Sequence, residues 1–123
     1  MNKINRTLSI LLPIMVAIGF SNTLPAQQPS DLRQSCALLT NTSLPDTTIS
    51  SAEVIEANSF TSSGSNSTFT TPVFCRVVGV TSPQVNFEVW LPLDNWNGKY
   101  NGVGNGGMAG VISYAAMAGA LNR

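Results

Sequence analysis

The chain contains no histidine among its 123 residues. A Ser-His-Asp triad, a Cys-His pair and a histidine-based metal site all need an imidazole, so none of them can be built from these residues. The sequence also contains no Gly-x-Ser-x-Gly nucleophile elbow and no Gly-Lys-Ser/Thr phosphate loop. The residues present therefore exclude the usual histidine-dependent hydrolytic centres, and we expect no metal or other cofactor in this part of the protein.

Charged residues are scarce, at 10% of the chain, with six basic and six acidic side chains. They form no basic patch, and we therefore expect no nucleic-acid partner. Two of the basic residues, Lys3 and Arg6, precede an apolar run over residues 8–20, and a small polar stretch follows as far as Ala26. This order is typical of a secretory signal peptide, which we place at residues 1–26.

The apolar run is shorter than the ~20 residues that span a bilayer as a helix. An uncleaved membrane anchor is thus the weaker alternative, and we expect no stable membrane anchor after cleavage. The mature protein would be secreted or periplasmic, and residues 27–123 would belong to a single domain.

The chain has two cysteines, Cys36 and Cys75. An even number of cysteines behind an export signal predicts one disulfide, formed in an oxidising compartment. Two buried free thiols are the alternative. A zinc site is not expected, because two thiolates without a histidine do not complete its ligand shell.

Apolar periodicity and turn residues predict helices near the two ends of the mature chain and strands between them. The β-branched run 47–55 predicts a strand. Two alternating segments, 73–81 and 85–93, are separated by a short Ser-Pro-Gln turn and predict an antiparallel hairpin. The remaining expected elements are helices over 32–39 and 111–121, a loop over 58–71 and a short strand over 99–103.

The glycine-rich run 96–110 follows the last long strand and precedes the C-terminal helix. Strand, glycine-rich turn and helix are the arrangement in which α/β proteins present backbone N–H groups to an anion. A tight turn that packs the helix on the strand explains the same composition, and the residues alone favour this second interpretation. A dinucleotide fingerprint matches weakly, because no acidic residue lies ~20 positions further on. The candidate anion donors are the amides of Gly104, Asn105, Gly106, Gly107 and Met108.

Few side chains offer chemistry of their own. Trp90 and Trp96 are the aromatic candidates for stacking on a ligand, but packing is the better interpretation for a tryptophan on a strand or in a turn. Asp94 is expected to be a turn residue. Glu88 has no second acid at a matching spacing, so the sequence indicates no general acid/base pair.

A linked set of motifs is more specific than any of these features alone. The set comprises Thr-Ile-Ser-Ser-Ala at 48–52, Phe-Cys-Arg-Val at 74–77, Phe-Glu-Val-Trp-Leu-Pro at 87–92, Trp-Asn-Gly-Lys-Tyr at 96–100 and Gly-Val-Gly-Asn-Gly-Gly-Met-Ala-Gly at 102–110. Together these motifs resemble the start of the tannase/feruloyl esterase family, over about residues 34–123.

The resemblance implies an α/β protein: the amino-terminal portion of an α/β-hydrolase fold, made of a β-hairpin, a glycine-rich loop and a helix, and incomplete in itself. It implies a secreted serine esterase whose small-molecule substrates are aromatic-acid esters such as gallates and ferulates. It matches Cys36 and Cys75 to the family's amino-terminal disulfide. It matches the glycine loop to the segment near the scissile ester oxygen, which makes Gly106 or Gly107 the oxyanion-hole donor.

The family's catalytic Ser, Asp and His, and a lid with a structural calcium site, belong to parts of its members that have no counterpart in these residues. We therefore expect residues 27–123 to be a truncated piece of such an enzyme, which carries only the oxyanion loop and is inactive by itself. A complete, small exported β-rich binding or structural module with one disulfide is the alternative.

Overall fold

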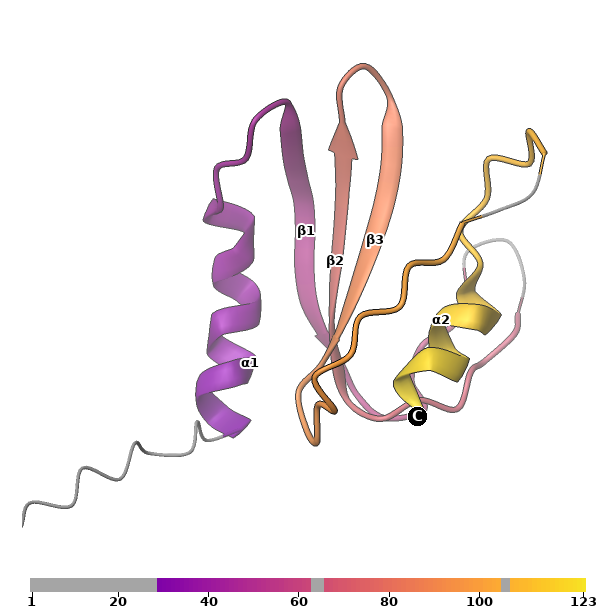
Figure 1. Ribbon diagram of the computed structural model, residues 1–123. Coiled ribbons are helices and arrows are strands. Elements are labelled where there is room, and N and C mark those ends of the chain that lie inside the picture. The colour runs from indigo at the N-terminus through magenta and orange to yellow at the C-terminus, as the bar shows by residue number, and fades with distance from the viewer. Residues whose placement is uncertain (1–28, 63–65, 105–106) are drawn as a thin grey trace, which may run out of the picture.

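The computed structural model describes residues 29–62, 66–104 and 107–123. In this part of the chain, three antiparallel strands form one sheet in the order β1-β2-β3, with a helix on either side (Figure 1). In chain order, the elements are α1 (Pro29–Leu38), the 3-10 turn η1 (Leu39–Asn41), β1 (Thr47–Ile55), β2 (Phe74–Thr81), β3 (Val85–Pro92) and α2 (Tyr114–Leu121).

The strands follow the sequence closely. β1 has the bounds that its β-branched run predicts, and β2 and β3 form the expected hairpin. The first helix is also confirmed, although it begins at Pro29, where a proline suits the first turn because its missing N–H would have no partner there. Asp31 lies in the same turn and favours the helix through its interaction with the helix dipole.

The expected α/β class is wrong for the described residues. Every strand pair is antiparallel, and the fold is mostly β with two short helices, so the expected start of an α/β-hydrolase fold is not what these residues form. A strand, a glycine-rich run and a helix do occur in that order, but such a pattern does not fix how strands pair. The short connection between β2 and β3 does fix it, because parallel neighbours need a long crossover.

Two local predictions are also wrong. Residues 99–103 form no strand, and Tyr100 within them is 89% exposed, so this stretch lacks the packed neighbour that a strand needs. The second helix begins at Tyr114 instead of residue 111. Apolar residues at 111 and 112 continue the helical pattern in the sequence, but they precede the observed first turn.

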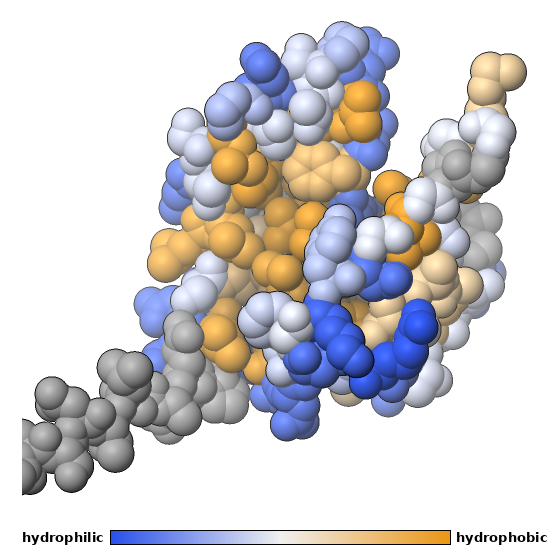
Figure 2. All heavy atoms as spheres, in the orientation of Figure 1, coloured by the Kyte–Doolittle hydropathy of each residue, from blue (hydrophilic) through white to orange (hydrophobic). Residues whose placement is uncertain are grey.

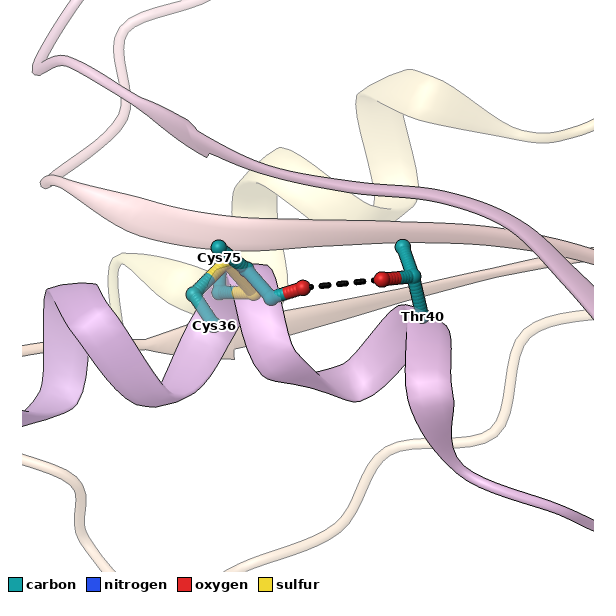
Figure 3. Close-up of a disulfide and its surroundings, with 4 residues drawn as sticks. Cys36, Thr40 and Cys75 are labelled. Carbon is teal, nitrogen blue, oxygen red and sulfur yellow. Dashed lines mark hydrogen bonds between the residues drawn. A yellow bond between two sulfur atoms is a disulfide. The ribbon is translucent and has the colours of Figure 1, made fainter.

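One face of the sheet packs against α1 through the disulfide. The Cys36–Cys75 bond joins α1 to β2 with the two Cα atoms 5.7 Å apart, and both cysteines are buried (Figure 3). Val77 and Leu93 complete this core. The expected disulfide is therefore confirmed and the free-thiol alternative is excluded. Closing a loop with a sequence separation of 39 residues contributes roughly 3–4 kcal/mol in the chain-entropy account.

The other face of the sheet carries an aromatic core. Phe74 and Trp90 are stacked with ring centroids 4.5 Å apart, and Phe60 from the long loop lies 4.7 Å from Trp90. Helix α2 covers this core with Ala118 and Tyr114. Trp90 is thus a packing residue, as expected from its position on a strand.

The third strand is covered unevenly. It pairs with β2 along one edge, and within the described residues no strand pairs with its other edge. On the face toward α1, Val85, Val89 and Leu91 are 60%, 37% and 40% exposed, because α1 lies over β1 and β2. Figure 2 shows apolar residues gathered on this side of the molecule, between α1 and the segment that follows β3.

Candidate functional site

The glycine-rich segment, defined here as residues 94–113 and described except at 105–106, leaves the sheet directly after β3. The residue before it, Leu93, is hydrogen-bonded to the start of the hairpin: its N–H donates to the Val73 carbonyl at 3.3 Å. The turn that follows is held by the Trp96 indole N–H, which donates to the Lys99 carbonyl at 3.3 Å, and by the Lys99 N–H, which donates to Asn97 Oδ1 at 3.0 Å. The segment is therefore ordered locally by turn contacts more than by packing.

Three of its glycines, Gly98, Gly107 and Gly110, have a backbone conformation that favours glycine. Gly107 and Gly110, the two that precede α2, have φ values of 60° and 61°, in the left-handed region that most other residues enter only with strain. A Cβ placed on either would meet no atom within 4 Å. These glycines therefore shape the chain, and they do not make room for a packed neighbour.

The expected oxyanion donors are only half described. Gly106 lies outside the described residues. Gly107 is exposed, and its N–H makes no hydrogen bond within the described part of the chain. The structure does not bring Gly107 together with Cys36 and Cys75, which are buried beneath α1 on the sheet.

An open groove of about 1530 Å³ runs beside the glycine-rich segment, β3 and α2. Trp96 and Tyr100 line it and are 68% and 89% exposed. The expectation that Trp96 packs into the protein is therefore wrong. Phe87 and Leu91 of β3 also line the groove, which combines apolar and aromatic side chains with polar ones such as Asn97 and Lys99.

A buried polar cluster lies across the sheet from α1. Glu88 on β3 has a side chain only 6% exposed, and its carboxylate accepts hydrogen bonds from Arg76 Nε at 2.9 Å and Arg76 Nη2 at 2.6 Å. The Trp90 indole N–H donates to the same carboxylate at 3.1 Å, and the Tyr114 hydroxyl donates at 3.0 Å. Arg76 also contacts Glu53 at 3.4 Å. We call Arg76, Glu88, Trp90 and Tyr114 the Glu88 cluster.

Opposing effects set the pKa of Glu88. Burial disfavours the charged carboxylate, but hydrogen bonds from Arg76, Trp90 and Tyr114, with the positive charge of Arg76, outweigh it and hold the pKa of Glu88 below its usual value. Burial raises the pKa of the Tyr114 hydroxyl, and its hydrogen bond to Glu88 adds to that effect. Glu88 is therefore an ionised acceptor and Tyr114 a neutral donor at neutral pH.

The sequence predicts no role for Glu88, because no second acid lies at a matching spacing, and it predicts no chemical role for Arg76 or Tyr114. A signal was nevertheless present in the hairpin. The register places Arg76 opposite Trp90 and Glu88 opposite Val78, so Arg76 and Glu88 are diagonal neighbours on one face of two strands that are otherwise mostly apolar. Tyr114 gave no such signal, because its contact depends on the tertiary position of α2.

Neither a metal site nor a membrane span is indicated in residues 29–62, 66–104 and 107–123. They contain no cluster of three or more acidic, cysteine or histidine side chains that could hold a metal ion. No helix in this part of the chain has the length and apolar character needed to cross a membrane.

Comparison with known proteins finds one informative relative. The chain is 40% identical over 120 residues to a Xanthomonas campestris pv. campestris protein named "Uncharacterized esterase". The match covers 94% of this chain but only 20% of that protein, so the chain spans about a fifth of the length of the curated relative. No known protein-family profile and no solved structure matches the chain. The disulfide independently indicates a compartment outside the reducing cytoplasm.

Proposed function

We propose that this chain is the amino-terminal part of a longer ester hydrolase, to which its glycine-rich segment supplies a backbone N–H for the oxyanion. The observation that carries the proposal is the 40% identity, over 94% of this chain, to a protein whose name says that it is an esterase. Ester hydrolysis needs a donor about 3 Å from the oxygen that becomes negative as the carbonyl is attacked. One such donor contributes about 3–4 kcal/mol to the stability of the transition state.

The geometry of Gly107 supports this role. Its N–H has no partner in the described part of the chain, and an exposed glycine in the left-handed region can bring its amide close to a ligand without a Cβ in the way. Gly106 stays an equal candidate by position in the motif. The groove beside the segment, rimmed by Trp96 and Tyr100, suits a substrate with an aromatic ring, and this supports aromatic-acid esters such as ferulates and gallates.

The remaining machinery must come from other residues of the longer protein, because this chain has no histidine. In the proposed reaction, a serine oxygen attacks the ester carbonyl carbon while a histidine takes the serine proton. The alcohol leaves with that proton, and water then releases the acid from the acyl-enzyme. A structural calcium ion, if the longer protein binds one, would lie in a lid outside these residues.

The test compares two products of the gene. One is the protein obtained when the gene is read past the codon for Arg123, and the other is the chain of residues 1–123. Each would be exported, purified and assayed on methyl ferulate, methyl gallate and 4-nitrophenyl acetate. We expect the longer protein to hydrolyse at least one ester and to react with a fluorophosphonate serine probe, and the 123-residue chain to do neither. Failure of the longer protein in both assays would refute the esterase proposal, and turnover by the short chain would refute its inactivity.

The second candidate is a small exported β-rich binding or structural module. The disulfide and the packing on both faces of the sheet favour it, because a finished small domain needs such supports. It predicts a stop codon after Arg123 and a single cooperative urea transition that gives the same midpoint by fluorescence and by far-UV circular dichroism. A reading frame that continues, with non-coincident transitions for the short chain, would count against it.

A further inference from the structure

Helix α2 makes polar contacts at its two ends, one to the sheet and one to the loop that precedes β2. At its start, the Tyr114 hydroxyl donates to Glu88 Oε1 at 3.0 Å. Beyond its end, Asn122 Nδ2 donates to the Thr70 carbonyl at 2.8 Å. The first contact reaches the buried Glu88 cluster, whereas the second reaches a loop carbonyl, so the two ends are anchored to different parts of the protein.

The start of α2 has little support of its own. Ser113 is the N-cap residue, but its side chain makes no capping hydrogen bond, and no acidic residue lies in the first turn. The helix is short, with eight residues, and a helix of that length depends on tertiary contacts. The Tyr114 ring packs on Phe60 and Trp90, with ring centroids 5.1 Å and 6.0 Å away. Its hydroxyl then fixes the rotation of the first turn relative to β3.

Tyr114 directly follows the glycine-rich segment. Gly110 lies four positions before Tyr114, and Gly107 seven positions before it, both in the left-handed conformation. At the other end, the Leu93 N–H is bonded to the Val73 carbonyl of the sheet. The segment is thus a loop that is anchored at its N-terminal end by the Leu93–Val73 hydrogen bond, and Tyr114 provides one of the contacts that anchor its C-terminal end to β3.

A buried ion pair contributes less to stability than its Coulomb attraction suggests, because both charges lose water. Its use can lie in fixing one arrangement among several that are similar in energy. In the Glu88 cluster, the bidentate Arg76 fixes the Glu88 carboxylate, and one of its oxygens then accepts from Tyr114. These hydrogen bonds therefore fix the position of the start of α2 relative to the β2–β3 hairpin.

We propose that Arg76, Glu88 and Tyr114 are positioning residues, which fix the start of α2 and thereby hold residues 107–113 of the glycine-rich segment in one conformation. Only the purpose of that conformation, which is to direct the Gly107 amide at an ester oxygen, rests on the proposed function. The effect of these residues on the conformation of the segment can be measured by NMR in the 123-residue chain, and this measurement needs no enzymatic activity.

Tyr114→Phe is the variant that tests it, because it removes only the hydroxyl and keeps the ring in the aromatic core. We expect amide exchange at Ala116 and Met117, whose N–H groups donate to the Ser113 carbonyl at 3.1 Å, to become about tenfold faster relative to Val77 in β2. We also expect the NMR order parameters of the Gly107 and Gly110 amides to fall, since the hydrogen bond that fixes the C-terminal end of the segment to Glu88 is removed.

Asn122→Ala is the matched control, because it removes the two side-chain hydrogen bonds, to the Thr70 and Ala118 carbonyls, at the other end of the same helix. It should leave the Gly107 and Gly110 order parameters at their wild-type values. A purely structural role for Tyr114 predicts instead that both variants speed exchange throughout α2 and that neither changes the two glycine amides. That result, or unchanged Gly107 and Gly110 amides in Tyr114→Phe, would overturn the proposal.

Activity of the longer protein separates this inference from the function on which it rests. If Gly107 is the donor, Tyr114→Phe should lower kcat and leave KM nearly unchanged, because the donor acts mainly in the transition state. Looser glycine amides with an unchanged kcat would uphold the positioning role and refute Gly107 as the donor. Unchanged glycine amides would overturn the positioning role whatever the activity.

Discussion

At the scale of single residues, two glutamate–arginine pairs in this protein have the same chemistry and different surroundings. Glu56 pairs with Arg33 at 2.6 Å with side chains 63% and 42% exposed, whereas Glu88 pairs with Arg76 at 2.6 Å with side chains 6% and 20% exposed. Solvent screens the first pair, and its loss costs little. The second pair is shielded from water, so removing Glu88 leaves the mostly buried Arg76 guanidinium with only its longer contact to Glu53.

Glu88→Ala is therefore expected to lower the free energy of unfolding by about 3 kcal/mol, because Arg76 loses its principal acceptor and Trp90 and Tyr114 lose theirs. Glu56→Ala is the matched control, and we expect almost no change from it. Urea denaturation at neutral pH measures both. Equal effects of the two substitutions would show that the burial of Glu88 does not govern its contribution.

The lowered pKa of Glu88 predicts how the stability of the protein changes at acidic pH. A carboxylate whose folded pKa is below its unfolded value of about 4.3 stabilises the fold fully above that value, and the contribution disappears as the pH falls through the folded pKa. The stability difference between wild type and Glu88→Gln should thus be constant near neutral pH and shrink below about pH 4. Urea midpoints of both proteins from pH 7 to pH 2 test this, and a difference that does not shrink would contradict it.

The candidate site was only partly predictable from single residues. The disulfide between Cys36 and Cys75 was predicted correctly, because two cysteines that follow a predicted export signal indicate a disulfide. The partnership of Arg76 and Glu88 needed the hairpin register, which the residue types alone do not give. The contact of Tyr114 with Glu88 needed the position of a helix that is distant in sequence, and no local pattern contains that information.

At the scale of elements, a close contact within the hairpin depends on Gly79. A Cβ on this β2 residue would lie 2.4 Å from the Phe87 ring and 2.8 Å from the Thr48 backbone oxygen. The ring could turn aside, but the backbone oxygen belongs to the neighbouring strand β1 and can move only if the strands separate. Gly79 thus lets the Phe87 ring lie over the backbone of β2.

Gly79→Ala should therefore destabilise the protein by about 1–3 kcal/mol through overpacking. Gly104→Ala is the control, since a Cβ there meets no atom within 4 Å and its φ is not in the left-handed region. Thermal unfolding followed by circular dichroism compares the two. If Phe87→Ala restored the full stability of Gly79→Ala, the ring and not the Thr48 oxygen would be the obstacle.

The elements that the sequence predicted well are those specified by local alternation. β1, β2 and β3 follow from β-branched runs, and a short turn between two such runs allows only an antiparallel pair. The predicted α/β class is wrong because the order strand, glycine-rich run and helix does not determine how strands that are distant in sequence pair with one another. Residues 99–103 failed as a strand because their alternating residues have no packed neighbour among the described residues.

At the scale of the whole molecule, the two faces of the sheet are covered to different extents. The aromatic face is closed by Phe60 and α2, whereas the disulfide face is closed over β1 and β2 but leaves Val85, Val89 and Leu91 exposed. An apolar strand that has an unpaired edge within the described chain is a template for association with another polypeptide. Among the described residues, we therefore expect self-association through this exposed apolar side of β3, which carries Val85, Val89 and Leu91 and lies on the apolar side of the molecule in Figure 2.

Leu91→Lys should suppress that self-association, because a charge on an edge strand opposes edge-to-edge pairing. Leu91 is 40% exposed, so the lysine ammonium can reach water and the urea midpoint should change little. Leu44→Lys is the control, since Leu44 is 47% exposed, lies outside β3 and undergoes the same change of charge. Sedimentation velocity over a range of chain concentrations should show a shift toward monomer for Leu91→Lys and none for Leu44→Lys. Equal shifts would mean that net charge controls association, and no shift in either would mean that association does not involve β3.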